Sequence, residues 1–308
     1  MSNPKTVSIK TPYWDIAADL YFPPNFDDKK TYPAVITAHP IGSCKEQTSG
    51  NVYGKALAEA GFVAIAFDRS TQGSSGGAPR YVEDPVLAVE DIRCVVDYAV
   101  TLPFVDAERI GILGICGGGG YVLNAVMTER RLKAVASITG VNYGRLCREA
   151  FTGFDPIGQM EAMGKQRTAE ARGEAGRVDL FVPPSLEAAA ESGTKDVDVL
   201  GATDYYRRRC VNDHAGTRAL YSHRAASVGW DAFHLAETLL TVPMIVVVGD
   251  KPGGFGAYRD GLEIYARAAS KVKELVVVEG ATHYELYDQP EPVGQALAKL
   301  VPFFQANL

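Results

Sequence analysis

The sequence predicts an α/β fold, with a mostly parallel central sheet, helices on both faces of that sheet and a helical cap inserted between two of its strands. Three observations lead to this prediction. Short apolar runs typical of strands buried on both faces alternate with helix-period segments over about the first 140 residues. The alternation stops near residue 142 and resumes near residue 241. Parallel strands joined by crossover helices require this order of elements.

The expected elements can be located in order along the chain. Continuous apolar runs such as AVITA, FVAIAF and RIGILGI predict buried strands, Asp84-Pro85 opens one helix and Gly61 ends another. The predicted strands are 6–9, 16–22, 34–38, 62–67, 109–115, 132–138, 244–248 and 275–278. The predicted helices are 50–60, 85–99, the segment that follows Cys116, 258–269 and 292–304.

The middle of the chain has a different pattern, with helical stretches and no convincing buried strand. The helical stretches are 160–172, 185–192, 204–211 and 220–228. We therefore expect a core domain made of residues 1–141 and 241–308 and a helical cap made of residues 142–240. An insertion at this place in a parallel sheet lies over the carboxyl ends of the strands. The cap is expected to supply substrate contacts and no catalytic residue.

Composition and charge argue against several classes of function. The chain has 308 residues and a formal net charge of −6, so nothing favours binding to nucleic acid or to an anionic membrane. No apolar run approaches the roughly 20 residues that span a bilayer, and the N-terminus lacks a signal-peptide pattern. The five cysteines form no CxxC pair and no metal-ligand spacing with the five histidines. These features predict a cytoplasmic protein with reduced thiols, no metal and no cofactor.

Cys116 stands at a glycine-rich turn between a predicted strand and a predicted helix, in Gly114-Ile115-Cys116-Gly117-Gly118. A Gly-x-nucleophile-x-Gly turn in this context is typical of a nucleophile elbow, where a strained backbone leaves no room for neighbouring Cβ atoms. The spacing matches neither GxGxxG nor GxxxxGK[ST], the usual phosphate-binding patterns. We expect Cys116 to be a nucleophile whose pKa is lowered by the helix N-terminus and whose proton passes to a histidine.

The base is expected on the loop after the last strand, because nucleophile, acid and base follow one another in that order along such chains. His283 follows the predicted strand 275–278 and is the expected base. The histidines at positions 214, 223 and 234 fall in the cap, where a surface or packing role is the simpler interpretation.

The acid is harder to locate from the sequence. It is usually found a few positions past the glycine that ends the preceding strand, where this chain has Pro252 and Gly253. Asp250, directly after that glycine, is the expected acid. Two alternatives stay open: Asp260, which is more simply an exposed helix residue, and Asp288, which lies downstream of the base. Without a well-placed acid, a thiolate stabilised by the imidazolium could still react.

An oxyanion hole needs two backbone N–H groups aimed at the developing charge. Gly117, directly after the nucleophile, is one expected donor. Ile41 is the other, since Pro40 in the loop His39-Pro40-Ile41-Gly42 has no N–H. His39 is a candidate substrate-binding residue, although orienting or packing this loop is the simpler role.

Four segments together resemble the dienelactone-hydrolase-like branch of the α/β-hydrolases, which includes polyketide-transferase-like proteins. They are HPIGSCKEQTSG, FDRSTQGSSGGAPRYVEDP, ERIGILGICGGGGY and GATHYELYDQPE. The resemblance covers nearly the whole chain and implies an α/β-hydrolase fold, with Cys116 as nucleophile and His283 as base. Two features depart from the pattern. The loop DKPGGFG offers no usual acid, and His39 replaces the carboxylate of true dienelactone hydrolases, so dienelactone itself is not the expected substrate.

The expected activity is cleavage of an ester, lactone or thioester through an acyl-cysteine intermediate. Passage of the acyl group to an alcohol or amine is the alternative, and a non-catalytic ligand receptor is an alternative of another class. The partner would be a small-molecule or carrier-bound acyl substrate, with no nucleic acid and no membrane, and a homodimer is left open. Aromatic residues of the cap are expected to line the substrate pocket, in particular Tyr205, Tyr206, Trp230 and Phe233.

Overall fold

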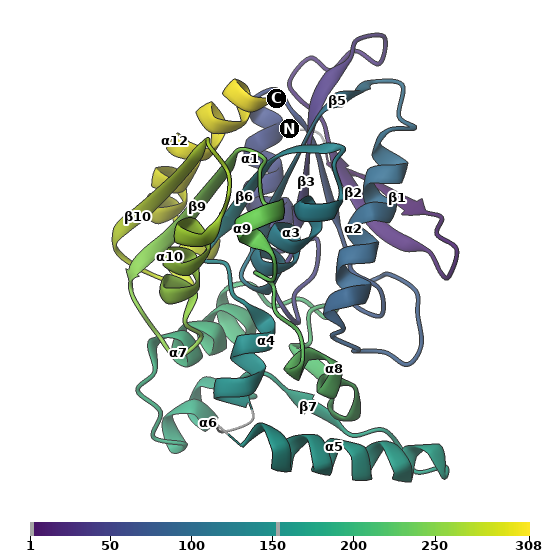
Figure 1. Ribbon diagram of the computed structural model, residues 1–308, viewed down its shortest axis with the longest axis vertical. Coiled ribbons are helices and arrows are strands. Elements are labelled where there is room, and N and C mark those ends of the chain that lie inside the picture. The colour runs from purple at the N-terminus through teal and green to yellow at the C-terminus, as the bar shows by residue number, and fades with distance from the viewer. Residues whose placement is uncertain (1–2, 152–154) are drawn as a thin grey trace.

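The computed structural model describes residues 3–151 and 155–308, and it confirms the predicted fold class (Figure 1). One eight-stranded sheet has the order β1-β2-β4-β3-β5-β6-β9-β10. Its first pairs, β1 with β2 and β2 with β4, are antiparallel, whereas all the others are parallel. The strands are β1 Lys5–Ile9, β2 Ile16–Tyr21, β3 Tyr32–Ala38, β4 Val63–Phe67, β5 Val105–Ile115, β6 Leu132–Ile138, β9 Met244–Lys251 and β10 Lys273–Thr282.

The apolar runs form strands because both faces of the sheet are covered. Every residue of β4 is buried, as a strand between two helical layers requires. The helices α2, α3 and α10 lie on one face, and α1 and α12 lie on the other (Figure 1). Their bounds are α1 Lys55–Glu59, α2 Pro85–Ala99, α3 Gly117–Thr128, α10 Ala257–Arg267 and α12 Pro290–Asn307.

Two of these helices illustrate how local sequence sets the boundaries. The carboxylate of Asp84 accepts hydrogen bonds from the N–H groups of Val86 and Leu87 and so caps α2. The predicted helix 50–60 is divided in the structure. It begins as a π-helical turn, η1 (Thr48–Gly54), and continues as the short helix α1.

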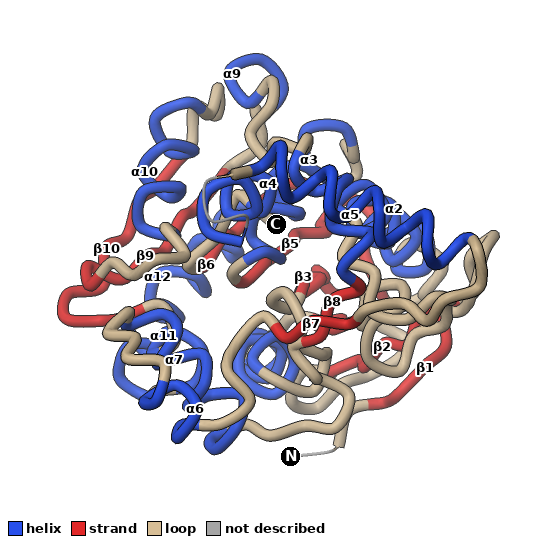
Figure 2. Tube along the Cα trace, turned by 90° about the horizontal axis from the view of Figure 1, so that it is seen from below, coloured by secondary structure: helices blue, strands red, loops and turns tan. Residues whose placement is uncertain are grey.

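Most of the chain between β6 and β9 lies below the sheet in Figure 1, and Figure 2 looks onto it from that end. Its elements are α4 Tyr143–Leu146, η2 Cys147–Phe151, α5 Pro156–Ala171, β7 Val178–Leu180, α6 Leu186–Glu191, α7 Val197–Asp204, η3 Tyr205–Arg209, β8 Arg218–Leu220, η4 Tyr221–Arg224, α8 Ala225–Val228 and α9 Ala236–Leu239. The strands β7 and β8 form an antiparallel ribbon that the sequence did not predict, because three residues are too few to show a period.

The last helix of this segment, α9, packs on α3 and α10 beside the sheet. The other elements of the segment gather around the strand ends, with α4 and α5 on one side and α6 and α7 on the other (Figure 2). The division of the chain at residues 142 and 240 into core and cap stays a prediction. In the described residues, no helix combines the length and the apolar character that crossing a membrane requires.

Candidate active site

Cys116 is held in a strained turn between β5 and α3. Its backbone has φ 54° and ψ −125°, a conformation with positive φ that residues other than glycine rarely adopt. A Cβ atom on Gly114 would lie 2.3 Å from the carbonyl oxygen of Gly118, and one on Gly118 would lie 2.6 Å from that of Ala38. The glycines of the elbow are therefore required by close backbone approach, and Cys116 itself is only 4% exposed.

Three hydrogen-bonding groups meet the thiol of Cys116. They are the backbone N–H groups of Gly117 and Ile41, the two expected oxyanion donors, and the hydroxyl of Tyr287. Burial outweighs these contacts and raises the pKa of the Cys116 thiol to about 11. The expectation of a lowered thiol pKa is therefore wrong for this closed site, because desolvation of the thiolate exceeds the effect of the helix N-terminus.

His283 follows β10 and faces the same thiol through Tyr287. Its Nε2 lies 3.1 Å from the Tyr287 hydroxyl, and its Nδ1 lies 2.7 Å from Oγ1 of Thr139. Burial lowers the pKa of His283 to about 3. A neutral imidazole beside a neutral thiol is thus the resting state, and His283 is free to accept a proton.

Tyr287 was not among the residues expected at the site. It lies four positions after His283, and the short helix α11 (Glu285–Asp288) brings the two side chains together. Burial keeps the pKa of Tyr287 well above its usual range, so its hydroxyl stays protonated. The spacing of His283 and Tyr287 by one helical turn is the sequence signal that could have revealed the pair.

None of the three carboxylates considered from the sequence hydrogen-bonds to His283 in the described part of the chain. Asp250 is exposed and accepts a hydrogen bond from the N–H of Gly280 at 2.7 Å. Asp260 is fully buried, contrary to expectation, and its carboxylate binds the Arg145 guanidinium at 2.7 and 2.8 Å. Asp288 forms an ion pair with Arg209. The structure does not bring Asp250 to the base, because its exposed carboxylate bonds the end of β9 to β10 through the N–H of Gly280.

A small cavity of about 20 Å³ adjoins the thiol of Cys116. Of the four aromatic residues named in particular for the pocket, Tyr206 lines it, and Phe181, another aromatic residue of the insertion, lines it too. The lining residues are Ile41, Cys116, Leu146, Phe181, Val182, Tyr206, Thr217, Phe255 and Tyr284. Tyr284 and Phe255 come from the two loops that the search for base and acid had singled out, so their positions could have been anticipated.

Three aromatic residues of the insertion lie away from this cavity. Tyr205 is fully buried behind it, and its hydroxyl accepts a hydrogen bond from the N–H of Thr48. Trp230 packs on Tyr121 with ring centroids 5.5 Å apart. Phe233 is buried in the core, and its carbonyl accepts a hydrogen bond from the Arg267 guanidinium of α10. Alternating patterns in the sequence do not distinguish such packing residues from pocket residues.

His39 is likewise absent from the lining of the cavity, so the expected substrate-binding role is not supported. The ring is fully buried, with Nδ1 2.7 Å from the carbonyl oxygen of Pro40 and Nε2 accepting the N–H of Arg69. The Arg69 guanidinium also donates to the His39 carbonyl and forms a buried ion pair with Glu83. His39 therefore holds the loop that presents the Ile41 N–H group.

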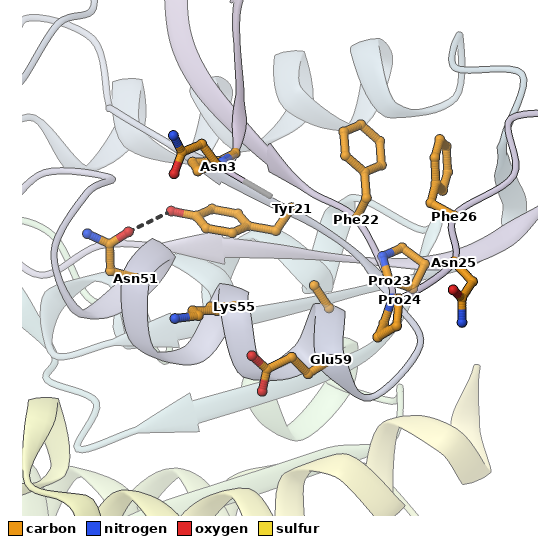
Figure 3. Close-up of a pocket in the computed structure, with 12 residues that line it drawn as sticks. Asn3, Tyr21, Phe22, Pro23, Pro24, Asn25, Phe26, Asn51, Lys55 and Glu59 are labelled. Atoms are coloured by element: carbon orange, nitrogen blue, oxygen red, sulfur yellow. Dashed lines mark hydrogen bonds between the residues drawn. The ribbon is translucent and has the colours of Figure 1, made fainter. Parts of the chain in front are cut away.

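A larger cavity, of about 680 Å³, lies elsewhere, between β2 and the helix α1 (Figure 3). Phe22, Pro23 and Pro24 form one side of it, and Lys55 and Glu59 of α1 form the other. Its lining contains no cysteine or histidine, so it lacks the cysteine–histidine pair found at Cys116. Within residues 3–151 and 155–308, no cluster of three or more histidine, cysteine or acidic side chains is arranged to hold a metal ion.

Relatives of the whole chain are found in bacteria. The chain is 38% identical over 303 residues to the uncharacterized protein YcjY of Escherichia coli K12, with 96% of each chain covered. It also resembles the crystal structure of the hypothetical protein PA2218 of Pseudomonas aeruginosa, with a TM-score of 0.88, 31% identity, and 99% of this chain and 94% of that chain covered. A thiohydrolase of Eupenicillium brefeldianum is 31% identical over 112 residues, which are 35% of this chain and 36% of that protein.

More distant structures agree in fold alone. The α/β-hydrolase GrgF of Penicillium is 17% identical with a TM-score of 0.80 over 99% of both chains.

The model of the dienelactone hydrolase family matches residues 16–162, which include the oxyanion loop and the elbow. The chain therefore belongs to the dienelactone hydrolase family and is an α/β-hydrolase that acts on ester-type bonds.

Proposed function

We propose that the protein cleaves an ester, lactone or thioester through an acyl-cysteine intermediate on Cys116. The observation that supports this most strongly is the set of groups around the thiol. Two backbone N–H groups, from Gly117 and Ile41, meet the sulfur on one side, and the Tyr287 hydroxyl links it to His283. Attack on a carbonyl carbon needs a nucleophile, a base and an oxyanion hole in this arrangement.

In the acylation step, the Cys116 proton passes by way of the Tyr287 hydroxyl to Nε2 of His283. The sulfur forms a bond to the substrate carbonyl carbon, and the carbonyl electron pair moves onto oxygen. The N–H groups of Gly117 and Ile41 stabilise that oxyanion. When the intermediate collapses, the alcohol or thiol leaves with the proton from His283, and an acyl-Cys116 remains.

In the second step, His283 takes a proton from water, and the resulting hydroxide attacks the acyl carbon. Collapse of this intermediate breaks the carbon–sulfur bond and returns the proton to Cys116. One water is consumed, and one carboxylic acid and one alcohol or thiol are produced. His283 starts and ends each step neutral, which is also its state in the closed site, where burial lowers its pKa to about 3.

A thioester is the substrate that the relatives favour. Thiohydrolases of two fungi match about a third of this chain, at 31% and 28% identity. The acyl group would arrive on a small molecule or on a carrier. A cytoplasmic location also belongs to this proposal, because all five cysteines are free, and the reaction needs a reduced thiol.

Acyl transfer is the second candidate, and the lining of the cavity favours it. Leu146, Phe181, Val182 and Phe255 give the cavity an apolar wall that excludes water. An alcohol or amine bound against that wall would replace water in the second step. The same acyl-Cys116 would precede both reactions.

The test is intact-mass measurement after incubation with a panel of acyl thioesters and p-nitrophenyl esters. We expect a mass increase of one acyl group in the wild-type protein and in Cys210→Ser, which removes a more exposed cysteine. We expect no increase in Cys116→Ala. Addition of an alcohol or amine then separates transfer from hydrolysis. An acyl adduct that persists in Cys116→Ala would contradict the proposal.

A further inference from the structure

The loop after β9, where the catalytic acid was expected, carries no side chain at Gly253, but a carboxylate from another element lies there. A Cβ atom on Gly253 would be 2.3 Å from Cγ of Asp198 and 2.5 and 2.6 Å from its two oxygens. Asp198 belongs to α7, in the inserted segment, 55 positions earlier in the chain. Its carboxyl group thus fills the space that a side chain at position 253 would take.

Asp198 is buried, and only one of its two oxygens has a partner. The side chain is 2% exposed, and Oδ2 accepts a hydrogen bond from the N–H of Phe255 at 2.9 Å. Oδ1 is inaccessible and has no hydrogen-bond partner among the described residues. An unpaired buried acceptor destabilises the folded chain, so such a group calls for an explanation.

The carboxylate of Asp198 shares a second cavity with the base. Asp198, Thr139 and His283 all line this space of about 10 Å³, which is about the room that one water molecule needs. Thr139 is the residue of this cavity that contacts the base directly, because its Oγ1 is 2.7 Å from Nδ1 of His283. With Nε2 accepting the Cys116 proton, Nδ1 carries hydrogen and donates to Thr139, whose own hydroxyl hydrogen can point toward the carboxylate.

Thr139 has the second unusual backbone of the site. Its φ is 43°, a left-handed conformation that is strained for a β-branched residue. Such strain persists where the surrounding structure enforces it, and it concentrates at functional sites. Here the conformation places the hydroxyl against the His283 ring.

We infer that Asp198 is the positioning carboxylate of this site, supplied by the inserted segment and acting on His283 through Thr139 and the cavity they share. The inference rests on the proposed roles of Cys116 and His283. No proton moves to Asp198. Its charge holds the Nδ1–H tautomer of His283 and stabilises the imidazolium that forms when Cys116 loses its proton.

This inferred role differs from the expectation that the insertion supplies substrate contacts and no catalytic residue. The start of α7 docks on the loop after β9 through two carboxylates, Asp196 to the N–H of Gly254 at 2.7 Å and Asp198 to that of Phe255. The reactive constellation is therefore complete only while α7 is docked. Asp250, the carboxylate expected from the sequence, has no part in it.

Several groups face Asp198 and bear on its charge. Burial raises the pKa of Asp198, the hydrogen bond from the Phe255 N–H lowers it, and the charge of Asp196 at the start of α7 raises it, with a net value of about 6. Lys251 of β9, Tyr258 of α10 and His283 line the same cavity. The carboxylate is ionised at neutral pH and gains its proton as the pH falls through about 6, well before His283 titrates.

The first test is the rate of Cys116 acylation by p-nitrophenyl acetate in Asp198→Asn. We expect a fall of roughly 10²–10⁴-fold, the scale of losing the carboxylate partner of a catalytic histidine. Asp204→Asn is the matched control, because it removes one charge from the same helix at a site away from the cavity. Wild-type rates should also fall below pH 6, and Asp198→Asn should lack this limb. Thermal unfolding should show that all three proteins are folded.

The second test moves the carboxylate. Gly253 has no left-handed φ, so the position accepts a side chain once Asp198 is removed. We expect the double variant Asp198→Gly with Gly253→Asp to be acylated at least tenfold faster than Asp198→Gly alone. The double variant Asp198→Gly with Gly253→Asn should be no faster than Asp198→Gly alone. An acylation rate in Asp198→Asn equal to wild type, or a slow variant that keeps the limb at pH 6, would overturn the inference. The inference would also be overturned if Asp250→Asn were acylated far more slowly than wild type while Asp198→Asn kept the wild-type rate. A wild-type protein that is never acylated would instead overturn the proposed function itself.

Discussion

The cavity at Cys116 has two walls that differ in origin and in chemistry. The core wall comes from the ends of sheet strands, and it is formed by Ile41, Cys116, Phe255 and Tyr284. The insert wall comes from the segment between β6 and β9, and it is formed by Leu146, Phe181, Val182, Tyr206 and Thr217. The core wall presents the thiol and the two N–H groups, whereas the insert wall is mostly apolar. The sheet therefore supplies the reacting thiol and the oxyanion donors, and the insertion closes the apolar side of the cavity.

The two walls are nevertheless joined at two places. The carbonyl oxygen of Gly42, next to the oxyanion donor, accepts a hydrogen bond from the N–H of Thr217 at 3.1 Å. A Cβ atom on Gly42 would lie only 2.7 Å from Cα of Thr217. Asp198 meets the loop after β9 on the other side. A cavity of about 20 Å³ is too small for an acyl chain, so the insert wall must move outward for substrate to enter.

The largest expected effect comes from the core wall. Cys116→Ala should remove acyl-enzyme formation and lower turnover on the order of 10⁶-fold, because the bond-forming atom is lost. Cys116→Ser should also be weak, since the site is built around sulfur. Steady-state rates with an acyl thioester measure both variants. Retention of more than a few per cent of activity in Cys116→Ala would mean that the nucleophile is another residue.

A smaller loss is expected at the link between thiol and base. Tyr287→Phe keeps the ring but removes the hydroxyl that bonds Cys116 and His283, and acylation should slow by roughly 10–100-fold, the value of a hydrogen bond to a charged group. Tyr205→Phe is the matched control, because its hydroxyl bonds the N–H of Thr48 behind the cavity. Equal rates in the two variants would show that the proton reaches His283 without Tyr287.

The pH dependence of Cys116 alkylation sharpens the contrast between a buried thiol and a thiolate–imidazolium pair. Burial raises the pKa of Cys116 to about 11, so the thiolate fraction should grow about tenfold for each pH unit between 7 and 10. The rate of iodoacetamide modification, followed by mass, should rise in the same way. A rate that is flat between pH 6 and 8 would indicate a pre-formed thiolate.

The smallest expected effect concerns the insert wall. Phe181→Ala enlarges the cavity and should shift the ratio of rates for long and short p-nitrophenyl esters by roughly three- to tenfold, the scale of a methylene or two in an apolar pocket. Trp230→Phe should leave that ratio unchanged, because Trp230 packs on Tyr121 away from the cavity. A larger shift in Trp230→Phe than in Phe181→Ala would place the acyl site elsewhere.

The core was largely predictable because its signals are local. The apolar run 34–38 lies within β3, and the elbow and the loop of His283 follow their strands as expected. The rest depends on contacts between distant segments. Asp198 looks like a polar residue of a turn-rich stretch, and only the docking of α7 brings it beside Gly253. The sequence predicts that Asp260 is an exposed helix residue, whereas in the structure it is buried and binds Arg145. The periodicity of a sequence reports on residues that are close along the chain and does not predict contacts between distant segments.

The most direct measurement locates the acyl group. The wild-type protein is mixed with a short acyl thioester, quenched in acid, digested and mapped by tandem mass spectrometry. We expect the added acyl mass on the peptide that contains Cys116, in proportion to active protein. An acyl group found instead on Cys44, Cys94, Cys147 or Cys210, or on no cysteine while the thioester is still consumed, would contradict catalysis by Cys116.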